Sequence, residues 1–308
     1  MNFNSQKPIC YKCLKSPKAA ELPYHGLHPA CFQAWFGTTL EFESLMLKPN
    51  PPEALARNLD HSSFFQGKYK KYSARLKQEN YIFKVQEKEY PALPTSEYLC
   101  NQLAEALDLE IPPYYLIRFQ NTLETFVVKN FMDKLEGNLV HLYRYFKEQE
   151  SEFNCAKIIE ILEQQMGSLK NIHRFIDICL FDALIGNHDR HGRNLGLIQT
   201  KEGCVLSPFY DNASYLCSED EALLVADHER TGRIGTLNQH NPGMTDYIQE
   251  FKRLGFEERI LKFHKKIKMQ TLLSLINSAF ITTQRKMAFE RLISKRYREM
   301  CDALSNTA

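Results

Sequence analysis

The chain has 308 residues, of which 44% are hydrophobic, 25% charged and 12% aromatic, and its formal net charge is +2. This length suits one two-lobed domain or two small ones, and the composition is that of an ordinary soluble globular protein. The near-neutral charge argues against nucleic-acid binding as the main function. We also expect no membrane span and, because no secretion signal pattern is present, folding in the cytoplasm.

The first fifty residues carry a cysteine and histidine pattern. Cys10 and Cys13 form C-x-x-C, and His28 and Cys31 form H-x-x-C fourteen residues later. Two such pairs suit two loops that hold one tetrahedral zinc ion, and four protein ligands would make that site structural. His25 is a competing ligand, and chance occurrence is the alternative to a zinc site. The other six cysteines are scattered, which favours reduced core residues over disulfides.

A second unit, residues 51–133, begins within a proline-marked linker at 49–59. Alternating residues predict a strand at 68–76 and another at 81–85. Lys84 lies inside the second strand among apolar neighbours, where a buried ammonium group needs a partner. In a phosphotransferase that partner would be the nucleotide's phosphates and a helical glutamate. A lysine on an edge strand, facing water, is the alternative.

Residues 95–109 predict a helix, because leucines repeat at every fourth position. Thr95 or Ser96 can cap it. We place Glu97 in the first turn, where the helix dipole favours a negative charge. Glu97 is also the best candidate partner for Lys84.

Two more predicted strands, 111–119 and 124–131, would complete a small sheet-rich lobe. The end of the second strand, residues 128–133, would be the hinge where a nucleotide base hydrogen-bonds to the backbone. Gly67 precedes the first strand of the lobe. A single glycine is only a weak signal for a loop that covers phosphates.

From about residue 138 onward the pattern turns helical, so residues 134–308 predict a mostly helical lobe. Apolar residues repeat at helical spacing in three regions, at 155–166, 171–186 and 246–302. Gly186 would end the second of these helices. Residues 217–245 show no period and would form a mobile loop over the substrate or a surface excursion.

Residues 185–211 concentrate the side chains that carry chemistry. Four polar residues lie in this stretch: Asp189, His191, Asn194 and Asp211. Apolar runs at 195–198 and 204–206 predict a hairpin, which would return Asp211 to the neighbourhood of Asn194. Oxygen ligands of this kind suit Mg²⁺, which keeps its other positions for phosphate oxygens and water. The further carboxylate of Asp189 could accept or orient a hydroxyl proton.

The run NHDRHGRN (187–194), followed by PFYD (208–211), resembles the catalytic and metal-binding motifs of the HipA-family serine/threonine kinase toxins. Three earlier segments are similar to further motifs of that family, in the same order: 67–76, YIFKV at 81–85, and 96–113. The resemblance covers about residues 60–308. The extra N-terminal subdomain of full-length HipA toxins has no counterpart, which makes the chain similar to short HipT-type toxins, whose missing piece is a separate small protein.

The resemblance implies an α+β, bilobal protein-kinase-like fold with a small β-rich N-lobe and a larger, mostly helical C-lobe. It implies ATP and Mg²⁺ as cofactors and phosphorylation of serine or threonine, with aminoacyl-tRNA synthetases as known substrates of the family. It also implies neutralisation by antitoxin proteins, one small and one able to bind DNA. We expect no direct nucleic-acid contact and action in the bacterial cytoplasm, with delivery to another cell as the alternative.

By position, the resemblance implies that Asp189 is the catalytic base and that Asn194 and Asp211 bind Mg²⁺. The residues expected to contact the nucleotide are Gln66, Gly67, Lys68, Lys84, Val128, Lys129, Asn130 and His191. Family members also phosphorylate a serine just before the glycine loop. Ser62 and Ser63 are the candidates here, although the residues directly before Gly67 are Phe64, Phe65 and Gln66.

Three alternatives have a basis in the sequence. Phosphoinositide kinases share a D-R-H-x-x-N loop, but their metal loop is D-F-G, whereas Asp211 is followed by Asn212 and Ala213. A metallohydrolase would use His188, Asp189 and His191 as ligands. A catalytically inactive kinase fold would act only as a binding partner.

Overall fold

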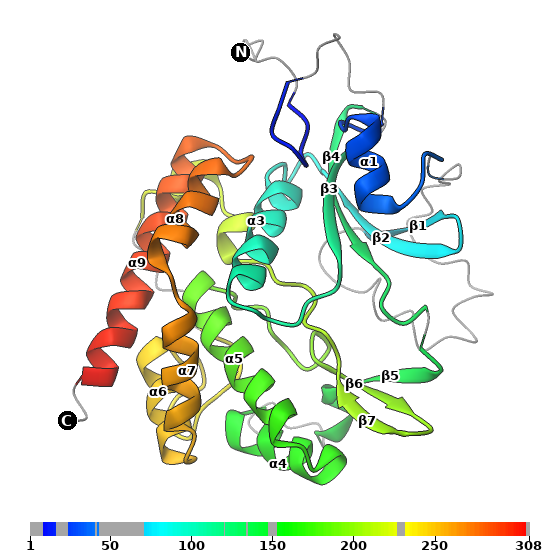
Figure 1. Cartoon of the computed structure of the whole chain (residues 1–308). Coiled ribbons are helices and arrows are strands. Elements are labelled where there is room, and N and C mark those ends of the chain that lie inside the picture. The colour runs from blue at the N-terminus through cyan, green and yellow to red at the C-terminus, as the bar shows by residue number, and fades with distance from the viewer. Residues whose placement is uncertain are drawn as a thin grey trace. The chain divides into compact units, whose positions relative to one another are not determined.

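The computed structural model describes residues 9–16, 24–40, 42, 71–119, 121–133, 135–146, 153–226 and 232–305. The chain divides into two compact units. Unit 1 consists of Met1–Tyr98 and Pro113–Asp133, and unit 2 consists of Leu99–Pro112 and Lys134–Ala308. Figure 1 shows the elements of each unit, and the two are described separately below.

Unit 1 contains an antiparallel sheet in the order β1-β2-β4-β3. All four predicted strands are confirmed within the described residues; residues 68–70 of the first prediction lie outside them, and the other three strands differ from their predictions by a few residues at their ends. Their bounds are β1 Lys71–Leu76, β2 Glu79–Val85, β3 Tyr114–Phe119 and β4 Leu123–Lys129. Successive side chains of a strand point to opposite faces. The sheet therefore presents Tyr81 and Phe83 on one face and Lys84 on the other.

The N-terminal segment covers the face that carries Tyr81 and Phe83. It contributes the short helix α1 (Pro29–Phe36), which lies beside β3 and β4 in Figure 1. Phe36 contacts Tyr81 with ring centroids 5.7 Å apart, and Phe42 contacts Phe83 at 5.2 Å. These aromatic contacts give the sheet an apolar cover on this face.

Helix α3 (Leu93–Ala106) begins before the predicted position. The prediction that Thr95 or Ser96 caps it is wrong, because both lie inside the helix and Thr95 donates a hydrogen bond to the carbonyl of Ala92. Pro94 lies in the first turn, where its missing N–H leaves no intrahelical bond unmade. Glu97 therefore follows the first turn instead of belonging to it.

Unit 2 contains a second antiparallel sheet in the order β5-β6-β7. The predicted hairpin is confirmed as β6 (Gly196–Thr200) and β7 (Gly203–Leu206). The helical pattern expected from about residue 138 is wrong at its start, because β5 (Gly137–His141) is a strand paired with β6. Five residues are too few to show a period, and the partner strand lies far along the chain.

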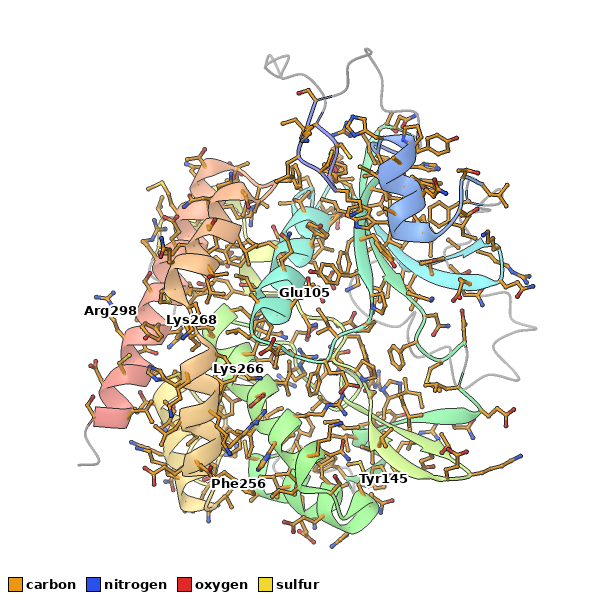
Figure 2. All side chains as sticks on the ribbon, viewed as in Figure 1. Glu105, Tyr145, Phe256, Lys266, Lys268 and Arg298 are labelled. Carbon is orange, nitrogen blue, oxygen red and sulfur yellow. The ribbon has the colours of Figure 1, made fainter. Side chains whose placement is uncertain are left out.

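The rest of unit 2 is mostly helical, as predicted. The helices are α4 Cys155–Met166, α5 Leu169–Ile185, α6 Met244–Arg253, α7 Glu257–Lys266, α8 Met269–Ser278 and α9 Thr283–Ser305. The long α5 is buried over most of its length and contacts α4, α6, α7 and α9. Side chains fill the space between these helices, whereas Arg298 extends from the outer side of α9 (Figure 2).

None of the nine cysteines forms a disulfide, and the six that lie beyond residue 50 were expected to be reduced. Among the described residues, no helix has both the length and the apolar character needed to cross a membrane.

Candidate active site

The loop that holds the predicted catalytic residue begins where α5 ends. Gly186 caps the helix with φ of 69°, a left-handed conformation that favours glycine. A Cβ atom at this position would also lie 2.8 Å from the ring of Tyr215. The packed helix and this close contact fix the point at which residues 187–194 enter the site.

Hydrogen bonds fix the backbone of this loop while leaving the Asp189 carboxylate in solvent. The buried side chain of Asn187 donates to Asp182 at 2.9 Å and accepts from the N–H of Asp189 at 3.0 Å. Asn194 Nδ2 donates to the carbonyl of Asp189 at 2.9 Å. The Asp189 side chain itself is 70% exposed. A carboxylate on a rigid backbone can meet an incoming hydroxyl group in one defined position.

Arg190 joins α5, the loop of residues 187–194 and the segment that carries Asp211. Its guanidinium group, almost fully buried, donates to both oxygens of Asp182 at 2.8 and 3.0 Å. Arg190 Nη1 also donates to the carbonyl of Asn194 at 3.3 Å and to that of Tyr210 at 2.6 Å. One nitrogen atom thus binds the backbone of both predicted metal-binding loops, so these loops lie side by side.

The Asp182 carboxylate stabilises the positive charge of Arg190. Burial acts to lower the pKa of Arg190, but the adjacent Asp182 carboxylate outweighs burial and leaves the pKa above its ordinary value. Arg190 Nη2 donates at 2.7 Å to Asn212, whose amide in turn donates to Asn101 at 3.1 Å. Asn212 is fully buried. The residue after Asp211 is therefore part of this network, which accounts for an asparagine where the D-F-G pattern has phenylalanine.

Asp211 adopts an unusual backbone conformation, with φ of 54°. Such a conformation is uncommon for a residue other than glycine, is tolerated best by aspartate and asparagine, and often occurs at functional sites. The hairpin brings Asp211 back toward the catalytic loop, since both Asp189 and Asp211 act electrostatically on the imidazole of His191.

His191 lies within electrostatic reach of both carboxylates. Burial lowers its pKa below the ordinary value, although Asp189 and Asp211 act in the opposite direction. Its Nδ1 accepts a hydrogen bond from the N–H of Arg193 at 3.2 Å. In the neutral ring the proton is then on Nε2, which lies 3.9 Å from the Asp189 carboxylate.

Gly192 allows the loop to lie directly against the backbone of the short helix η2 (Leu142–Tyr145). The N–H of Tyr143 donates to the carbonyl of Gly192 at 3.1 Å. A Cβ atom at position 192 would lie 2.9 Å from that backbone nitrogen. This position therefore has no room for a side chain unless the backbone moves.

In unit 1 the structure brings Lys84 and Glu97 together as an ion pair. Their side chains are 7% and 1% exposed, so the alternative of a water-facing lysine is wrong. The ammonium group also lies 5.9 Å from the centre of the Phe126 ring. An ammonium group has three N–H donors, a chemistry that suits an anionic ligand such as a phosphate.

The predicted hinge lies at the end of β4. The N–H of Lys129 donates to the carbonyl of Pro113, and the N–H of Asn130 donates to that of Asn80, both at 2.9 Å. Both groups are thus already bonded within unit 1. Val128 lies within β4, where it pairs with Ile82 of β2. The remaining predicted residues lie outside the described part of the chain: Ser62, Ser63, Gln66, Gly67 and Lys68.

The four candidate zinc ligands lie together in unit 1. The ligand atoms of Cys10, Cys13, His28 and Cys31 are all within 4.8 Å of one another. The competing ligand, His25, instead stacks on Phe119 with ring centroids 5.8 Å apart.

Four residues of the site had no role predicted from the sequence: Asp182, Asn187, Arg190 and Asn212. Asp182 lies within an apolar helix, which was a signal that a buried cation is nearby. Arg190 is flanked by polar residues and resembles an ordinary loop arginine. Its burial follows from the packing of three separate segments, which no local pattern reveals.

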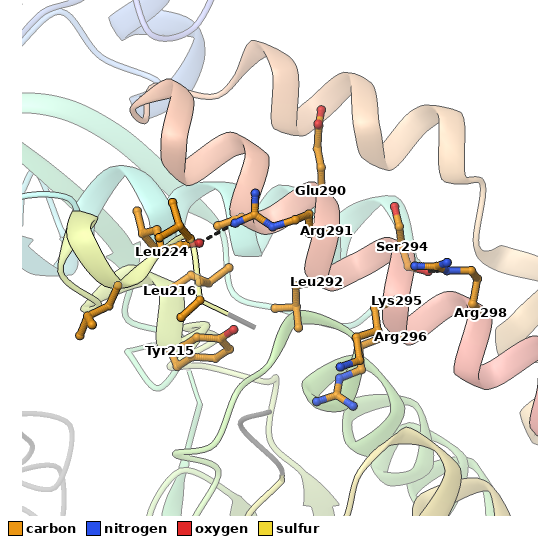
Figure 3. Close-up of a pocket in the computed structure, with 14 residues that line it drawn as sticks. Tyr215, Leu216, Leu224, Glu290, Arg291, Leu292, Ser294, Lys295, Arg296 and Arg298 are labelled. Atoms are coloured by element: carbon orange, nitrogen blue, oxygen red, sulfur yellow. Dashed lines mark hydrogen bonds between the residues drawn. The ribbon is translucent and has the colours of Figure 1, made fainter. Parts of the chain in front are cut away.

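A cavity of about 520 Å³ lies elsewhere in unit 2. It is bounded by η4 (Tyr215–Cys217), η5 (Glu221–Leu223) and α9. Figure 3 shows apolar residues such as Leu216 on one side and basic residues of α9, including Arg291, on the other. None of the predicted catalytic or metal-binding residues lines this cavity.

Solved structures with the same arrangement of elements define the class of fold. The chain is similar to the Helicobacter pylori proinflammatory kinase CtkA, with a TM-score of 0.64 and 17% identity, over 77% of this chain and 93% of that one. It is also similar to HipA of Shewanella oneidensis, solved with HipB and operator DNA, with a TM-score of 0.55 and 13% identity, over 91% and 80%. The protein thus has an α+β, bilobal protein-kinase-like fold with a β-rich N-lobe and a larger, mostly helical C-lobe.

The family model described as HipA-like C-terminal domain matches residues 58–304, and the chain belongs to this family. A putative kinase of Haemophilus influenzae is 27% identical over 220 residues, which are 61% of this chain and 62% of that protein. The putative kinase Y4dM of Sinorhizobium fredii is 23% identical over 181 residues, 52% of this chain and 44% of that protein. The matches thus span less than two thirds of these two relatives.

Proposed function

We propose that this protein is an ATP-dependent serine/threonine protein kinase and the toxin of a bacterial toxin-antitoxin pair. The observation that carries the proposal is the pair of loops bound by Arg190. They present the exposed carboxylate of Asp189 on a fixed backbone, next to a segment with the strained Asp211. Membership of the HipA-like family supports the same reading.

In this proposal Asp189 accepts the proton of the substrate hydroxyl group as that oxygen attacks the γ-phosphorus of ATP. The bond from this phosphorus to the β,γ-bridging oxygen breaks, and ADP leaves. Lys84, oriented by Glu97, holds the phosphates. Residues 66–68 cover them, residues 128–130 contact the base, and His191 contacts the nucleotide.

The donor atoms near Asp189 fit Mg²⁺. Asn194 uses its amide nitrogen to hold the carbonyl of Asp189, which leaves Oδ1 as the ligand atom of the side chain. Asp211 supplies a carboxylate, and Mg²⁺ prefers one or two such ligands together with phosphate oxygens and water. The ion, when bound, neutralises charge on the phosphates.

The proposed partners follow from the same family. The substrate is a protein of translation such as an aminoacyl-tRNA synthetase. The antitoxins are a small protein, as proposed for the short HipT-like form, and a DNA-binding protein. HipA of S. oneidensis, to which the fold is similar, was solved with HipB and DNA. We also propose autophosphorylation at Ser62 or Ser63 and action in the bacterial cytoplasm.

The alternatives have less support. A metallohydrolase needs His188, Asp189 and His191 around one ion. Within the described ranges, only the Cys10 cluster brings three or more such ligand atoms within 4.8 Å of one another. A lipid kinase and an inactive kinase fold remain alternatives that activity measurements distinguish from a protein kinase.

Nucleotide binding provides a direct test. We expect ATP with Mg²⁺, at a hundred times its dissociation constant, to raise the melting temperature by roughly 5 °C, because a ligand of the native state stabilises it. The double variant Lys84→Met with Glu97→Leu should fold but show no such shift, since it removes both buried charges together. Differential scanning fluorimetry measures this effect.

The matched control is Lys201→Met, which removes an exposed lysine in the turn between β6 and β7. This variant should respond to ATP as the wild type does. A metallohydrolase would instead be stabilised by a transition metal without ATP. An equal ATP shift in wild type and double variant would exclude Lys84 as the phosphate-binding residue.

The substrate can be identified by comparing cells that produce two forms of the protein. Phosphoproteomics of cells that produce the wild type or Asp189→Asn should reveal phosphoserine or phosphothreonine on a translation protein only with the wild type. If the two profiles do not differ while both proteins accumulate, the proposed protein-kinase activity is wrong for that cell.

A further inference from the structure

Two short segments of unit 1 bring three thiols and one imidazole to a single point. Cys13 Sγ lies 3.3 Å from His28 Nδ1, and Cys31 Sγ lies 3.9 Å from the same nitrogen. All four ligand atoms, including Cys10 Sγ, are within 4.8 Å of one another. Around a tetrahedral zinc ion, with bonds of about 2.1 Å to nitrogen and 2.3 Å to sulfur, neighbouring ligand atoms are roughly 3.5–3.8 Å apart. The cluster therefore needs only a small contraction to bind zinc.

The local backbone holds the ligands in this arrangement. The carbonyl of Cys10 accepts from the N–H of Leu14 at 2.9 Å, and the N–H of Cys10 donates to the carbonyl of Lys15 at 3.1 Å, which closes a tight turn around Cys13. On the other segment His28 directly precedes α1 and Cys31 lies in its first turn. A turn and a helix start thus supply two ligands each.

Tyr11, which lies between the two cysteines of the turn, connects this cluster to the sheet. Its hydroxyl group donates to the carboxylate of Glu124 on β4. Arg118 on β3 donates to the same hydroxyl group at 2.5 Å, and its guanidinium group lies 5.2 Å from the centre of the Tyr11 ring. The N–H of Arg118 also donates to the carbonyl of His25 at 2.6 Å.

We propose that Cys10, Cys13, His28 and Cys31 bind one structural Zn²⁺ ion, which clamps the N-terminal segment onto the sheet of unit 1 through Tyr11. Four protein ligands leave no open position, so the ion has no catalytic role. The clamp keeps Phe36 and Phe42 over the face that carries Tyr81 and Phe83. Because this apolar face stays covered, the sheet keeps its geometry. The opposite face, which carries Lys84, therefore keeps its geometry as well.

Zinc content is the first measurement. The full chain, expressed with zinc and purified without chelator, should contain about one zinc ion per molecule by elemental analysis. Cys13→Ser and Cys31→Ser should lose it. Cys204→Ser is the matched control, because this cysteine is also partly exposed but lies far along the chain in β7, and it should retain the ion. A wild-type chain that neither carries zinc nor takes it up after reduction would overturn the proposal.

The fluorescence of Trp35 provides the second measurement. It is made on the wild type, so it does not require a cysteine variant to fold. Trp35 is the only tryptophan of the chain, and its ring centroid lies 5.6 Å from that of Tyr115 on β3. Removal of zinc from the wild type with a strong chelator should shift the tryptophan emission to longer wavelength, and added zinc should reverse the shift. Loss of zinc without a change in emission would show that the ion does not hold the segment in place.

Tyr11→Phe separates the clamp from metal binding. This variant keeps all four ligands and should contain zinc, but should lose it to a chelator about tenfold faster, because the hydrogen bonds to charged Glu124 and Arg118 are gone. An unchanged rate of zinc loss would mean that Tyr11 does not couple the ion to the sheet. These readouts do not depend on phosphate transfer, so they stand or fall separately from the proposed kinase function.

Discussion

Replacement of Asp189 by asparagine is expected to reduce phosphate transfer by a factor of about 10²–10⁴, the range that a general base contributes. The variant is isosteric and the side chain is 70% exposed, so the fold and the affinity for ATP should be almost unchanged. The backbone carbonyl that accepts from Asn194 remains in place. The rate is measured by transfer of labelled phosphate from ATP to protein, and the fold by thermal melting.

Glu202→Gln is the control for this experiment. It neutralises an exposed carboxylate in the turn between β6 and β7 and should transfer phosphate at the wild-type rate. Normal transfer by Asp189→Asn would show that another group takes the proton. A large fall in melting temperature would show that the residue has a structural role as well.

Replacement of Arg190 by methionine should lower the free energy of unfolding of unit 2 by about 3–5 kcal/mol, because it leaves the buried carboxylate of Asp182 without its cation. This is a large part of the total stability of an ordinary domain, about 5–15 kcal/mol. Phosphate transfer should also be lost, since both loops depend on the same guanidinium group. Urea unfolding followed by far-ultraviolet circular dichroism reports on the helices of unit 2.

Arg298→Met on the outer side of α9 is the matched control and should change stability by less than about 0.5 kcal/mol. Arg190→Met combined with Asp182→Leu should be less destabilised than the sum of the two single variants, because the pair of charges is removed together. Equal unfolding midpoints for Arg190→Met and Arg298→Met would contradict the structural role given to the buried ion pair.

Local patterns predicted the elements whose signals lie within a short stretch of chain. Helix α5 follows from apolar residues at helical spacing, and the β6–β7 hairpin follows from two apolar runs around a turn. Strand β5 was missed because its pairing with β6 connects residues about sixty positions apart. The start of α3 was misplaced because Pro94 belongs to the first turn of the helix and does not precede it.

The candidate site likewise contains residues that the sequence predicted and residues that it did not. Chemistry alone predicted that Lys84 needs an acidic partner, and the structure brings Glu97 to it. The roles of Arg190 and Asn212 depend on how α5 and two loops pack together, and no spacing rule shows which loop arginine becomes buried. The groups proposed to react with or bind the substrate could thus be identified from the sequence, whereas the network that holds them could not.

The close approach of Gly192 to the backbone of Tyr143 has a consequence for how this protein can vary. Position 192 has no reactive group, but the neighbouring main chain leaves room only for glycine there. The side chains around it are constrained instead by the chemistry proposed for them. A random mutagenesis library selected for inactive but folded protein would therefore be enriched in substitutions at position 192 as well as at Asp189. In such a library, mutations alone would mark a packing constraint at position 192 and a proposed catalytic group three positions before it, and only the structure would separate the two.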